Sequence, residues 1–344
     1  MKQNEIISCV NLLDSNGNVL NPGYAKTALF KYDRKEIKAN KLRIKEWDYY
    51  CVLNNHFGIA LTIADNSYMG LDSITLFDFD NKSEISQTYM QFLTLGKKNF
   101  PSSSNEGEVK VQYDTHFIHF YLENGMRVLE FDVQNFKDQK ILSGKILLSD
   151  LPSESMVIAT PFDKPKHFYY NQKINCMRAE GEVRFGTEIL SFHKEDSFGV
   201  LDWGRGVWTY SNTWYWGSAS GLVNNKPFGF NIGYGFGNTS AATENMLFYE
   251  GKAHKLSHVE FIIPKDAQGK EKYLEPWTFT SDDGRFELVF EPILDRNSNA
   301  QVVVIQSDQH QVFGHFSGKV QLENGEVLII EKLIGFAEKV MNRW

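Results

Sequence analysis

Residues 57–64 read Phe-Gly-Ile-Ala-Leu-Thr-Ile-Ala, with a large apolar side chain at every second position. Side chains alternate between the two faces of a β-strand, so this stretch predicts a strand with one face of large residues. Similar runs of Val, Ile, Phe and Tyr, bounded by Gly, Asn or Asp, predict further strands over 113–121, 126–133, 226–234, 286–290 and 302–305. The pattern favours an all-β fold, with a short helix expected only near residues 333–340.

Two Asn-Gly pairs, Asn124-Gly125 and Asn324-Gly325, predict hairpins because both residue types tolerate positive φ. Each pair ends a Leu-Glu-Asn-Gly tetrapeptide. The shared tetrapeptide is explained either by an internal duplication or by chance. Three of the nine prolines fall within residues 151–166, which predicts a linker there. We therefore expect two strand-rich halves, 1–165 and 166–344, each an antiparallel barrel or strongly curved sheet, because closure removes exposed sheet edges.

The composition limits the classes of partner. Hydrophobic residues make up 42% and charged residues 23%, as in ordinary globular domains. The 36 Lys and Arg are outnumbered by 43 Asp and Glu, and no dense basic run occurs, so nucleic-acid binding is not expected. Three widely spaced cysteines predict no disulfide framework and favour a cytoplasmic location. No run resembles a signal peptide or is long enough to span a bilayer, so we expect no transmembrane segment.

Residues 202–216 hold four of the seven tryptophans: Trp203, Trp208, Trp214 and Trp216. Aromatic walls with few polar groups are typical of small-molecule pockets, although an aromatic core has the same composition. The polar members of the stretch are Asp202 and Arg205. Burial among indoles disfavours an ionised carboxylate, so Asp202 is a candidate general acid. The alternative is a structural Asp202–Arg205 ion pair.

Other polar residues are weaker candidates. Asn231 and Glu244 either face a barrel lumen or cap turns. In Lys45-Glu-Trp-Asp-Tyr-Tyr50, alternation places Glu46 and Asp48 on the face opposite Trp47, where they form either a site or a solvated surface. The histidines do not converge on a metal site. The run at 229–237 lies in a strand pattern rather than a dinucleotide-binding turn, so no cofactor is expected.

Two stretches resemble a signature of tandem lipocalin-like proteins, a group that includes the carotenoid 1,2-hydratases. They are Tyr169-Tyr-Asn171 and Gly199-Val-Leu-Asp-Trp-Gly-Arg-Gly-Val-Trp208. The resemblance places Asp202 at the aspartate of that motif and makes Tyr170 a candidate site residue. The chain has Trp203-Gly204-Arg205 where the motif continues with basic, acidic and aromatic residues.

A resemblance over most of the chain is to a bacterial family known only as a domain of unknown function. It rests on the segments 45–50, 202–208, 229–235 and 335–338. The resemblances imply two tandem lipocalin-like halves. The first functional hypothesis is binding of an apolar small molecule, a lipid or isoprenoid, in a tryptophan-lined cavity that includes Trp47. The second is hydration of an isoprenoid double bond with Asp202 as acid. Carbohydrate chemistry with paired carboxylates and a purely structural role are the remaining alternatives. The oligomeric state stays open.

Overall fold

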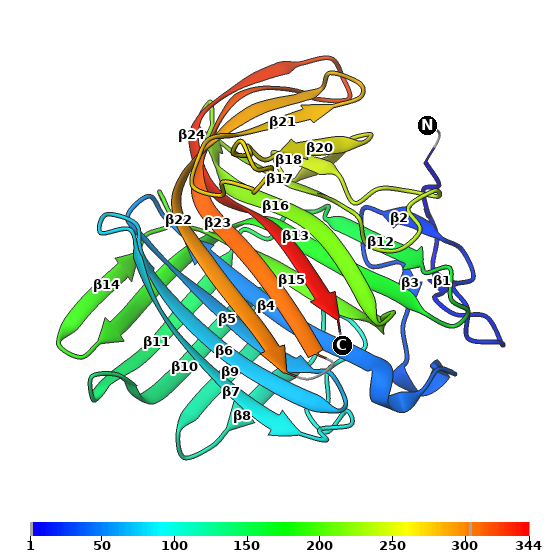
Figure 1. Ribbon diagram of the computed structural model, residues 1–344, viewed down its shortest axis with the longest axis horizontal. Helices are drawn as coiled ribbons and strands as arrows, with labels where there is room; N and C mark the ends of the chain where they lie inside the picture. The colour runs from blue at the N-terminus through cyan, green and yellow to red at the C-terminus, as the bar shows by residue number, and fades with distance from the viewer. Residues whose placement is uncertain (1–2, 303–304, 344) are drawn as a thin grey trace.

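The computed structural model describes residues 3–302 and 305–343, and nearly all of its regular structure is β (Figure 1). The first large sheet has the order β7-β6-β5-β4-β15-β13-β11-β10-β9-β8, with β2, β12 and β14 attached beside it. Its strands are β2 (Gly23–Ala25), β4 (Ile44–Leu53), β5 (Phe57–Asp65), β6 (Met69–Asp78), β7 (Ser83–Phe92), β8 (Glu108–Gln112), β9 (His116–Glu123), β10 (Met126–Lys137), β11 (Lys140–Ser149), β12 (Met156–Pro161), β13 (Phe168–Phe185), β14 (Glu188–Phe192) and β15 (Phe198–Val207).

The second large sheet has the order β19-β18-β17-β16-β24-β23-β22-β21-β20 and is also antiparallel throughout. Its strands are β16 (Ser211–Val223), β17 (Lys226–Tyr234), β18 (Met246–Tyr249), β19 (Lys252–Lys255), β20 (Val259–Ile262), β21 (Trp277–Ser281), β22 (Phe286–Val302), β23 (Ile305–Gln321) and β24 (Val327–Arg343). The remaining elements are β1 (Val10–Asn11), β3 (Phe30–Lys31) and two 3-10 turns, η1 (Arg34–Glu36) and η2 (Lys41–Arg43). No described helix is long and apolar enough to cross a membrane.

The all-β prediction is confirmed, and the expected strands fall within β5, β9, β10, β17 and β22, although β9 begins at His116 rather than at residue 113. The strand expected at 302–305 includes residues 303 and 304, which lie outside the described part of the chain. The helix expected near 333–340 is wrong. Those residues belong to β24, which is paired with β16 on one side and β23 on the other, so sheet pairing satisfies their backbone.

The change from the first to the second sheet falls between Val207 and Ser211, not at the expected boundary after residue 165. Residues 168–207 return to the first sheet as β13, β14 and β15, and β15 pairs with β4 along its whole length. The proline-rich segment 151–166 contains β12 and its flanking turns. It therefore separates two strands of one sheet.

The strand order is repeated in the two sheets. In each, a four-strand meander (β4–β7 or β16–β19) pairs through its first strand with the last strand of the following meander, β15 or β24. The repeat extends to backbone detail. Gly181 on β13 has φ +145° and Gly318 on β23 has φ +144°, and an added Cβ would overlap the carbonyl oxygen of Lys145 or Glu287 on the neighbouring strand.

The Leu-Glu-Asn-Gly tetrapeptides do not mark this repeat. Both Asn-Gly pairs form turns between antiparallel strands, as predicted. Asn124-Gly125 joins β9 to β10, whereas Asn324-Gly325 joins β23 to β24, and these connections are not equivalent in the repeated strand order. The topology therefore supports an internal repeat, and the tetrapeptide identity contributes nothing to it.

Each sheet curves around a core of its own, and the outer faces of the two sheets pack together. Leu61, Leu129 and Trp203 belong to the first core, and Phe230 and Trp277 to the second. Between the sheets, a third apolar layer includes Phe77 and Phe313, whose ring centroids are 4.2 Å apart, and Tyr49 and Trp216, at 5.9 Å. Asp202 and its polar partners, described below, lie in this layer between the sheets, whereas Arg205 lies inside the first core.

Candidate functional site

Strand β15 presents two different environments, because alternate side chains face opposite sides of the first sheet. Trp203 faces the first core, where its ring lies 5.3 Å from Tyr170 and 6.3 Å from Tyr32. Asp202 faces the second sheet instead. Arg205 is two residues from Trp203 and therefore lies on the same face of β15, opposite to Asp202. The Asp202–Arg205 pair considered from the sequence is not formed.

Arg205 is the centre of a buried polar cluster inside the first core. Its Nη1 donates to Asp48 Oδ1 at 2.9 Å and to the carbonyl of Trp47 at 2.8 Å, and its Nη2 donates to the carbonyl of Pro101 at 3.2 Å. Glu46 lies 3.9 Å from its Nε. Glu46 and Asp48 share one face of β4, as alternation predicted, but they are buried around this guanidinium rather than solvated.

Asp202 has two partners on β13. Both lie on the face of the first sheet that packs against the second sheet. Lys173 Nζ lies 2.8 Å from Asp202 Oδ2, and Asn171 Nδ2 donates to Asp202 Oδ1 at 2.6 Å. All three residues are buried. One carboxylate oxygen of Asp202 therefore accepts a hydrogen bond, and the other is paired with a full positive charge.

Lys173 connects the two sheets. Its Nζ lies 3.6 Å from the ring centroid of Trp216 on β16, close enough for a cation–π interaction. The indole nitrogen of Trp216 donates to Asn231 Oδ1 at 2.7 Å. Asn231 Nδ2 in turn donates to the carbonyl of Glu244 at 2.9 Å and lies 3.4 Å from Glu244 Oε2. A continuous polar chain thus runs from Asp202 to Glu244.

Glu338 on β24 is a third carboxylate of this region. Trp214 Nε1 donates to its Oε1 at 2.9 Å, and Gln311 Nε2 donates to its Oε2 at 3.2 Å. Burial raises the pKa of Glu338 to about 7, and the charge of Asp202 acts in the same direction, while the hydrogen bond from Trp214 and the Lys173 ammonium partly offset the rise. The carboxyl is therefore about half protonated near neutral pH.

Glu244 and Tyr169 complete the group. Burial is the main cause that raises the pKa of the partly buried Glu244, against the opposing charge of Lys173. The pKa of Tyr169 is raised well above its usual range by burial and then by the negative charges of Glu244, Asp202 and Glu338. Tyr169 is thus coupled to all three carboxylates. We call Asp202, Lys173, Glu244, Glu338 and Tyr169 the inter-sheet site.

A wall of aromatic rings borders the inter-sheet site. Trp208 packs edge-on against Trp47 at 5.2 Å, Trp214 at 5.7 Å and Phe236 at 4.8 Å. Tyr169 contacts Phe236 at 4.9 Å and stacks on Trp47 at 6.3 Å. Trp208 and Phe236 are buried, whereas Trp47 and Trp214 are partly exposed. The aromatic wall therefore reaches the solvent at two of its indoles.

The structure divides the sequence-predicted site residues into two groups. One group lies at or beside the inter-sheet site: Asp202, Trp208, Trp214, Trp216, Asn231, Glu244 and Trp47. The other group faces the first core: Trp203, Arg205 and Tyr170, whose hydroxyl donates to the carbonyl of Phe30 at 3.3 Å. The expected cavity lined by Trp203 together with the other three tryptophans is therefore not formed.

Sequence reasoning missed Lys173, Glu338 and Tyr169 as members of the site. A signal for two of them is present, because Tyr169, Asn171 and Lys173 alternate along one strand and so share a face. Glu338 lies in a segment that was expected to be helical, which concealed its pairing with β16 and β23.

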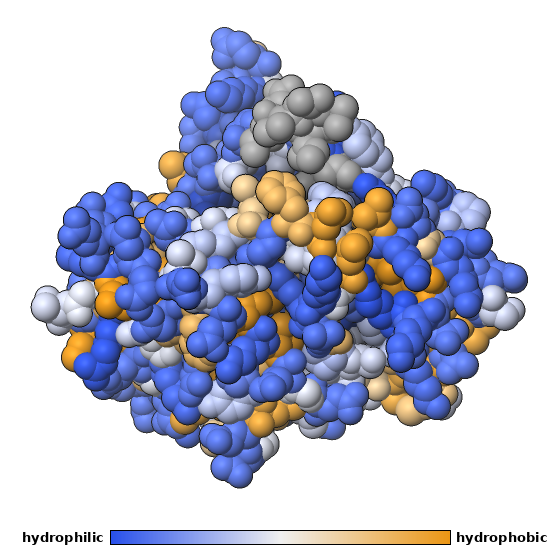
Figure 2. Space-filling view, turned by 90° about the horizontal axis from the view of Figure 1, so that it is seen from below, coloured by the Kyte–Doolittle hydropathy of each residue, from blue (hydrophilic) through white to orange (hydrophobic). Residues whose placement is uncertain are grey.

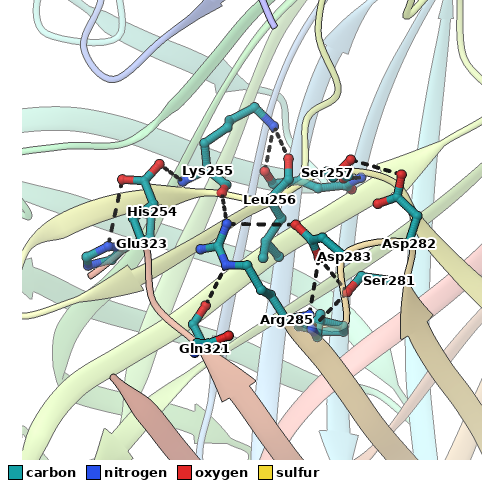
Figure 3. Close-up of polar contacts among 12 residues, drawn as sticks. His254, Lys255, Leu256, Ser257, Ser281, Asp282, Asp283, Arg285, Gln321 and Glu323 are labelled. Carbon is teal, nitrogen blue, oxygen red and sulfur yellow. Dashed lines mark hydrogen bonds and ion pairs between the residues drawn. The ribbon is translucent and has the colours of Figure 1, made fainter. Parts of the chain in front are cut away.

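A separate polar cluster lies at the rim of the second sheet (Figure 3). Arg285 Nη1 donates to the carbonyl of Lys255 at 2.8 Å, and Glu323 Oε1 accepts from the backbone N–H of Lys255 at 2.9 Å. His254 lies 3.9 Å from Glu323. The Lys255 ammonium donates to Thr243 and to two backbone carbonyls. This cluster joins β19, the 281–285 turn and the end of β23, which is a structural role.

Two hollows lie elsewhere. One, of about 20 Å³, is bordered by Asp48, Tyr50 and Arg127, and the other is an open groove over β9, β10, β11 and β13; neither is lined by Asp202. Within residues 3–302 and 305–343, no group of three His, Cys, Asp or Glu side chains is arranged to hold a metal ion.

One family model matches the chain, that of the domain of unknown function DUF2804, and the match covers residues 3–344. The chain belongs to the DUF2804 family. This DUF2804 protein is similar to a solved structure from Nitrosomonas europaea provisionally assigned as an AttH, with a TM-score of 0.55 and 12% identity over 90% of this chain and 96% of that one. The likeness is one of fold, and it confirms the expectation of two tandem lipocalin-like halves.

Further solved structures show a weaker likeness to the DUF2804 protein. Kievitone hydratase from Nectria haematococca has a TM-score of 0.49 and 10% identity, over 91% of this chain and 92% of that one. CghA with Sch210972 has a TM-score of 0.48 and 9% identity, over 96% and 97%. No curated protein matches the chain.

Proposed function

We propose that the inter-sheet site binds a mostly apolar small molecule, of the lipid or isoprenoid class, that carries a polar group. The observation that carries the proposal is the partial exposure of Trp47 and Trp214 beside the buried Asp202–Lys173 pair. Large rings around a few fixed polar groups are the usual lining of a small-molecule site. Neither of the two hollows described above is lined by Asp202, so in this proposal the ligand reaches the site by displacing these two indoles.

The polar end of the ligand has defined partners in this proposal. The hydroxyl of Tyr169 makes no hydrogen bond to the described residues, and Glu244 is only partly buried. Asp202, by contrast, has both oxygens occupied by Lys173 and Asn171. A ligand hydroxyl or carbonyl is therefore recognised by Tyr169 and Glu244, while Asp202 holds Lys173 in place.

Binding is tested by titrating the purified protein with N-phenyl-1-naphthylamine, a neutral apolar fluorophore, and by native mass spectrometry of the protein as isolated. We expect saturable binding that Trp214→Ala weakens about tenfold, the loss from one aromatic contact. Tyr113→Ala is the control, because Tyr113 is a half-exposed ring in the turn between β8 and β9, away from the site. Unsaturable fluorescence, with no co-purifying molecule, argues against the proposal.

A second candidate function is acid-catalysed hydration of an isoprenoid double bond. The observation that favours it is the pKa of about 7 at Glu338, which suits a general acid near neutral pH. Protonated Glu338 would transfer its proton to one alkene carbon, water would add to the other, and the water proton would return to the Glu338 carboxylate. The developing cation would be stabilised by the aromatic wall. In this version Glu338 replaces Asp202 as the acid.

Hydration is tested with squalene and geranylgeraniol in ¹⁸O-labelled water, followed by mass spectrometry of the products. Label in an alcohol product, lost in Glu338→Gln and retained in Asp202→Asn, supports Glu338 as the acid. Loss only in Asp202→Asn restores the original assignment. Binding without any incorporation of label leaves the binding function alone. Glycosidase chemistry with Glu46 as the partner of Asp202 is not proposed, because Glu46 lies on the opposite face of the first sheet.

A further inference from the structure

Four large apolar side chains are exposed together at the end of edge strand β7 and in the loop that follows. The exposed fractions are 62% for Met90, 82% for Phe92, 55% for Leu93 and 47% for Leu95. Strand β7 is the last strand at one end of the first sheet. Several large apolar side chains exposed close together in the sequence mark interaction sites more often than single exposed residues do. Figure 2 shows the underside of the molecule, where hydrophobic side chains are exposed among hydrophilic ones.

The backbone of the loop holds two of these leucines in an unfavourable conformation. Leu93 has φ +55° and Leu95 has φ +51°, the left-handed region that residues other than Gly, Asn and Asp rarely adopt. Hydrogen bonds fix this conformation: the N–H of Leu93 donates to the carbonyl of Tyr68, and that of Leu95 donates to the carbonyl of Ser67. The loop is thus built to present leucines to solvent where a polar Asn would be less strained.

The lysine-rich segment before β4 contacts Ser67, whose carbonyl holds this loop. Ser67 joins the loop to the segment before β4, because its hydroxyl donates to the carbonyl of Ile44 and accepts from Arg34 Nη2 at 3.0 Å. That segment exposes Leu42 and four lysines, and the loop adds one more: Lys31, Lys35, Lys38, Lys41 and Lys97. Only two carboxylates of residues 31–45, Asp33 and Glu36, are exposed. The surplus of positive charge stands out in a chain whose formal net charge is -7.

We infer that this lysine–leucine face docks on an anionic lipid bilayer. Apolar side chains that enter the acyl boundary, flanked by lysines that meet anionic headgroups, are the combination that binds a peripheral protein to a membrane. Charge decides between a bilayer and a second copy of the chain: two such faces would bring their lysines together, whereas an anionic surface attracts them. The inference does not depend on the function proposed for the inter-sheet site.

The same segment also contacts the aromatic wall that borders the inter-sheet site. Arg43 Nη2 donates to the carbonyl of Trp208 at 3.0 Å, and Lys45 Nζ lies 5.2 Å from the ring of Trp208. A protein docked through the lysine–leucine face would therefore hold the aromatic wall close to the membrane surface. An apolar ligand could then move between bilayer and site with a short exposure to water.

The test is co-sedimentation of the full chain with vesicles of phosphatidylcholine alone or mixed with phosphatidylglycerol. We expect binding to the mixed vesicles that falls as salt rises, because the lysine contacts are screened. Leu93→Asn/Leu95→Asn should lower the partition coefficient about tenfold or more. Its thermal midpoint should stay unchanged or rise, because Asn adopts positive φ more readily than Leu. Lys35→Gln/Lys38→Gln should lower the partition coefficient about fivefold per lysine, and only on the mixed vesicles.

Leu274→Asn is the matched control, because Leu274 is 61% exposed on the second sheet's side of the molecule. It should sediment like the unmodified chain. The inference is overturned if the mixed vesicles do not bind the chain at low salt, or if Leu274→Asn and the Leu93/Leu95 pair lose binding equally. It is also overturned if sedimentation velocity shows a dimer that the Leu93/Leu95 pair abolishes, without vesicle binding.

Discussion

Asp202 and Glu338 occupy matching positions in the two sheets. Each lies on the strand that pairs with the first strand of a four-strand meander, β15 beside β4 or β24 beside β16, and each faces the other sheet. Asp202 is paired in register with Tyr49 and Lys173, and Glu338 with Trp216 and Gln311. The ring centroids of these two matching residues, Tyr49 and Trp216, lie 5.9 Å apart. The inter-sheet site therefore contains corresponding residues from both halves of the internal repeat. The two halves differ because Lys173 occupies the position that Gln311 has in the other half.

The first prediction concerns the pH dependence of stability. Because the folded pKa of Glu338 is raised to about 7, the native state binds its proton more tightly than the unfolded chain does. Its contribution is thus fully present below the ordinary glutamate pKa of about 4.5 and is lost as pH rises to about 7, a change of about 3 kcal/mol. Urea unfolding of Glu338→Gln and of the unmodified chain should show the variant gaining relative stability over that interval.

The control for this prediction is Glu331→Gln, an exposed carboxylate on the same strand. Its stability relative to the unmodified chain should not change over the same pH range. If the relative stability of Glu338→Gln is equally flat, burial does not perturb Glu338 and the acid role proposed for it loses its basis.

The second prediction concerns the ion pair between the sheets. Lys173→Met removes the ammonium and leaves the buried Asp202 carboxylate with only Asn171 as a partner. Breaking one side of a buried pair costs about 3 kcal/mol or more, whereas replacing both sides by apolar groups is close to neutral. Urea unfolding of Lys173→Met, Asp202→Leu and the double variant forms a double-mutant cycle.

We expect the double variant to be more stable than Lys173→Met alone, with a coupling energy of about 2 kcal/mol. Additive losses would show that the two residues do not interact, contrary to the 2.8 Å contact. The indole fluorescence of Trp216 should also change in Lys173→Met, because the ammonium lies over its ring.

The third prediction separates the two faces of β15. Arg205→Lys keeps the charge but cannot reach Asp48, the carbonyl of Trp47 and the carbonyl of Pro101 together, because it lacks the planar fork. We expect a loss of about 3 kcal/mol in unfolding free energy. Binding of N-phenyl-1-naphthylamine to the folded variant should stay within about twofold, because the substitution lies inside the first core. A large loss of binding by a variant with unchanged stability would contradict this arrangement.

The strands were predictable from sequence because their signal is local. Alternation identified β5 and β17, and it assigned Glu46 and Asp48 correctly to one face of β4. The same rule shows that Asp202 and Arg205, three residues apart on one strand, cannot share a face. Their pairing was expected because they are the charged residues of one aromatic stretch, and the alternation of side chains along a strand was not applied to them.

The rest depended on pairing between distant segments. Residues 168–207 belong to the first sheet because β15 pairs with β4, which lies about 150 residues earlier in the sequence. Neither strand alone specifies that partner. Lys173 and Trp216 meet only once both sheets have formed and packed. A single sequence therefore located the aromatic stretch but could not show which polar groups it would meet.

The last prediction concerns the contact that holds Trp47 in the aromatic wall. Gly204 lies opposite Trp47 in the β4–β15 register, and a Cβ added to Gly204 would overlap the indole ring. Gly204→Ala must therefore displace Trp47 from its contacts with Trp208 and Tyr169. We expect a loss of about 3 kcal/mol in unfolding free energy and weaker probe binding in the fraction that folds.

Gly221→Ala on β16 is the control, because its added Cβ would meet only the flexible end of Leu333. It should cost less than about 1 kcal/mol and leave probe binding unchanged. If both glycine variants bind the probe as the unmodified chain does, Trp47 is not part of the binding surface. If Gly204→Ala alone loses binding at a temperature where circular dichroism shows it folded, the position of the Trp47 ring determines whether the inter-sheet site accepts a ligand.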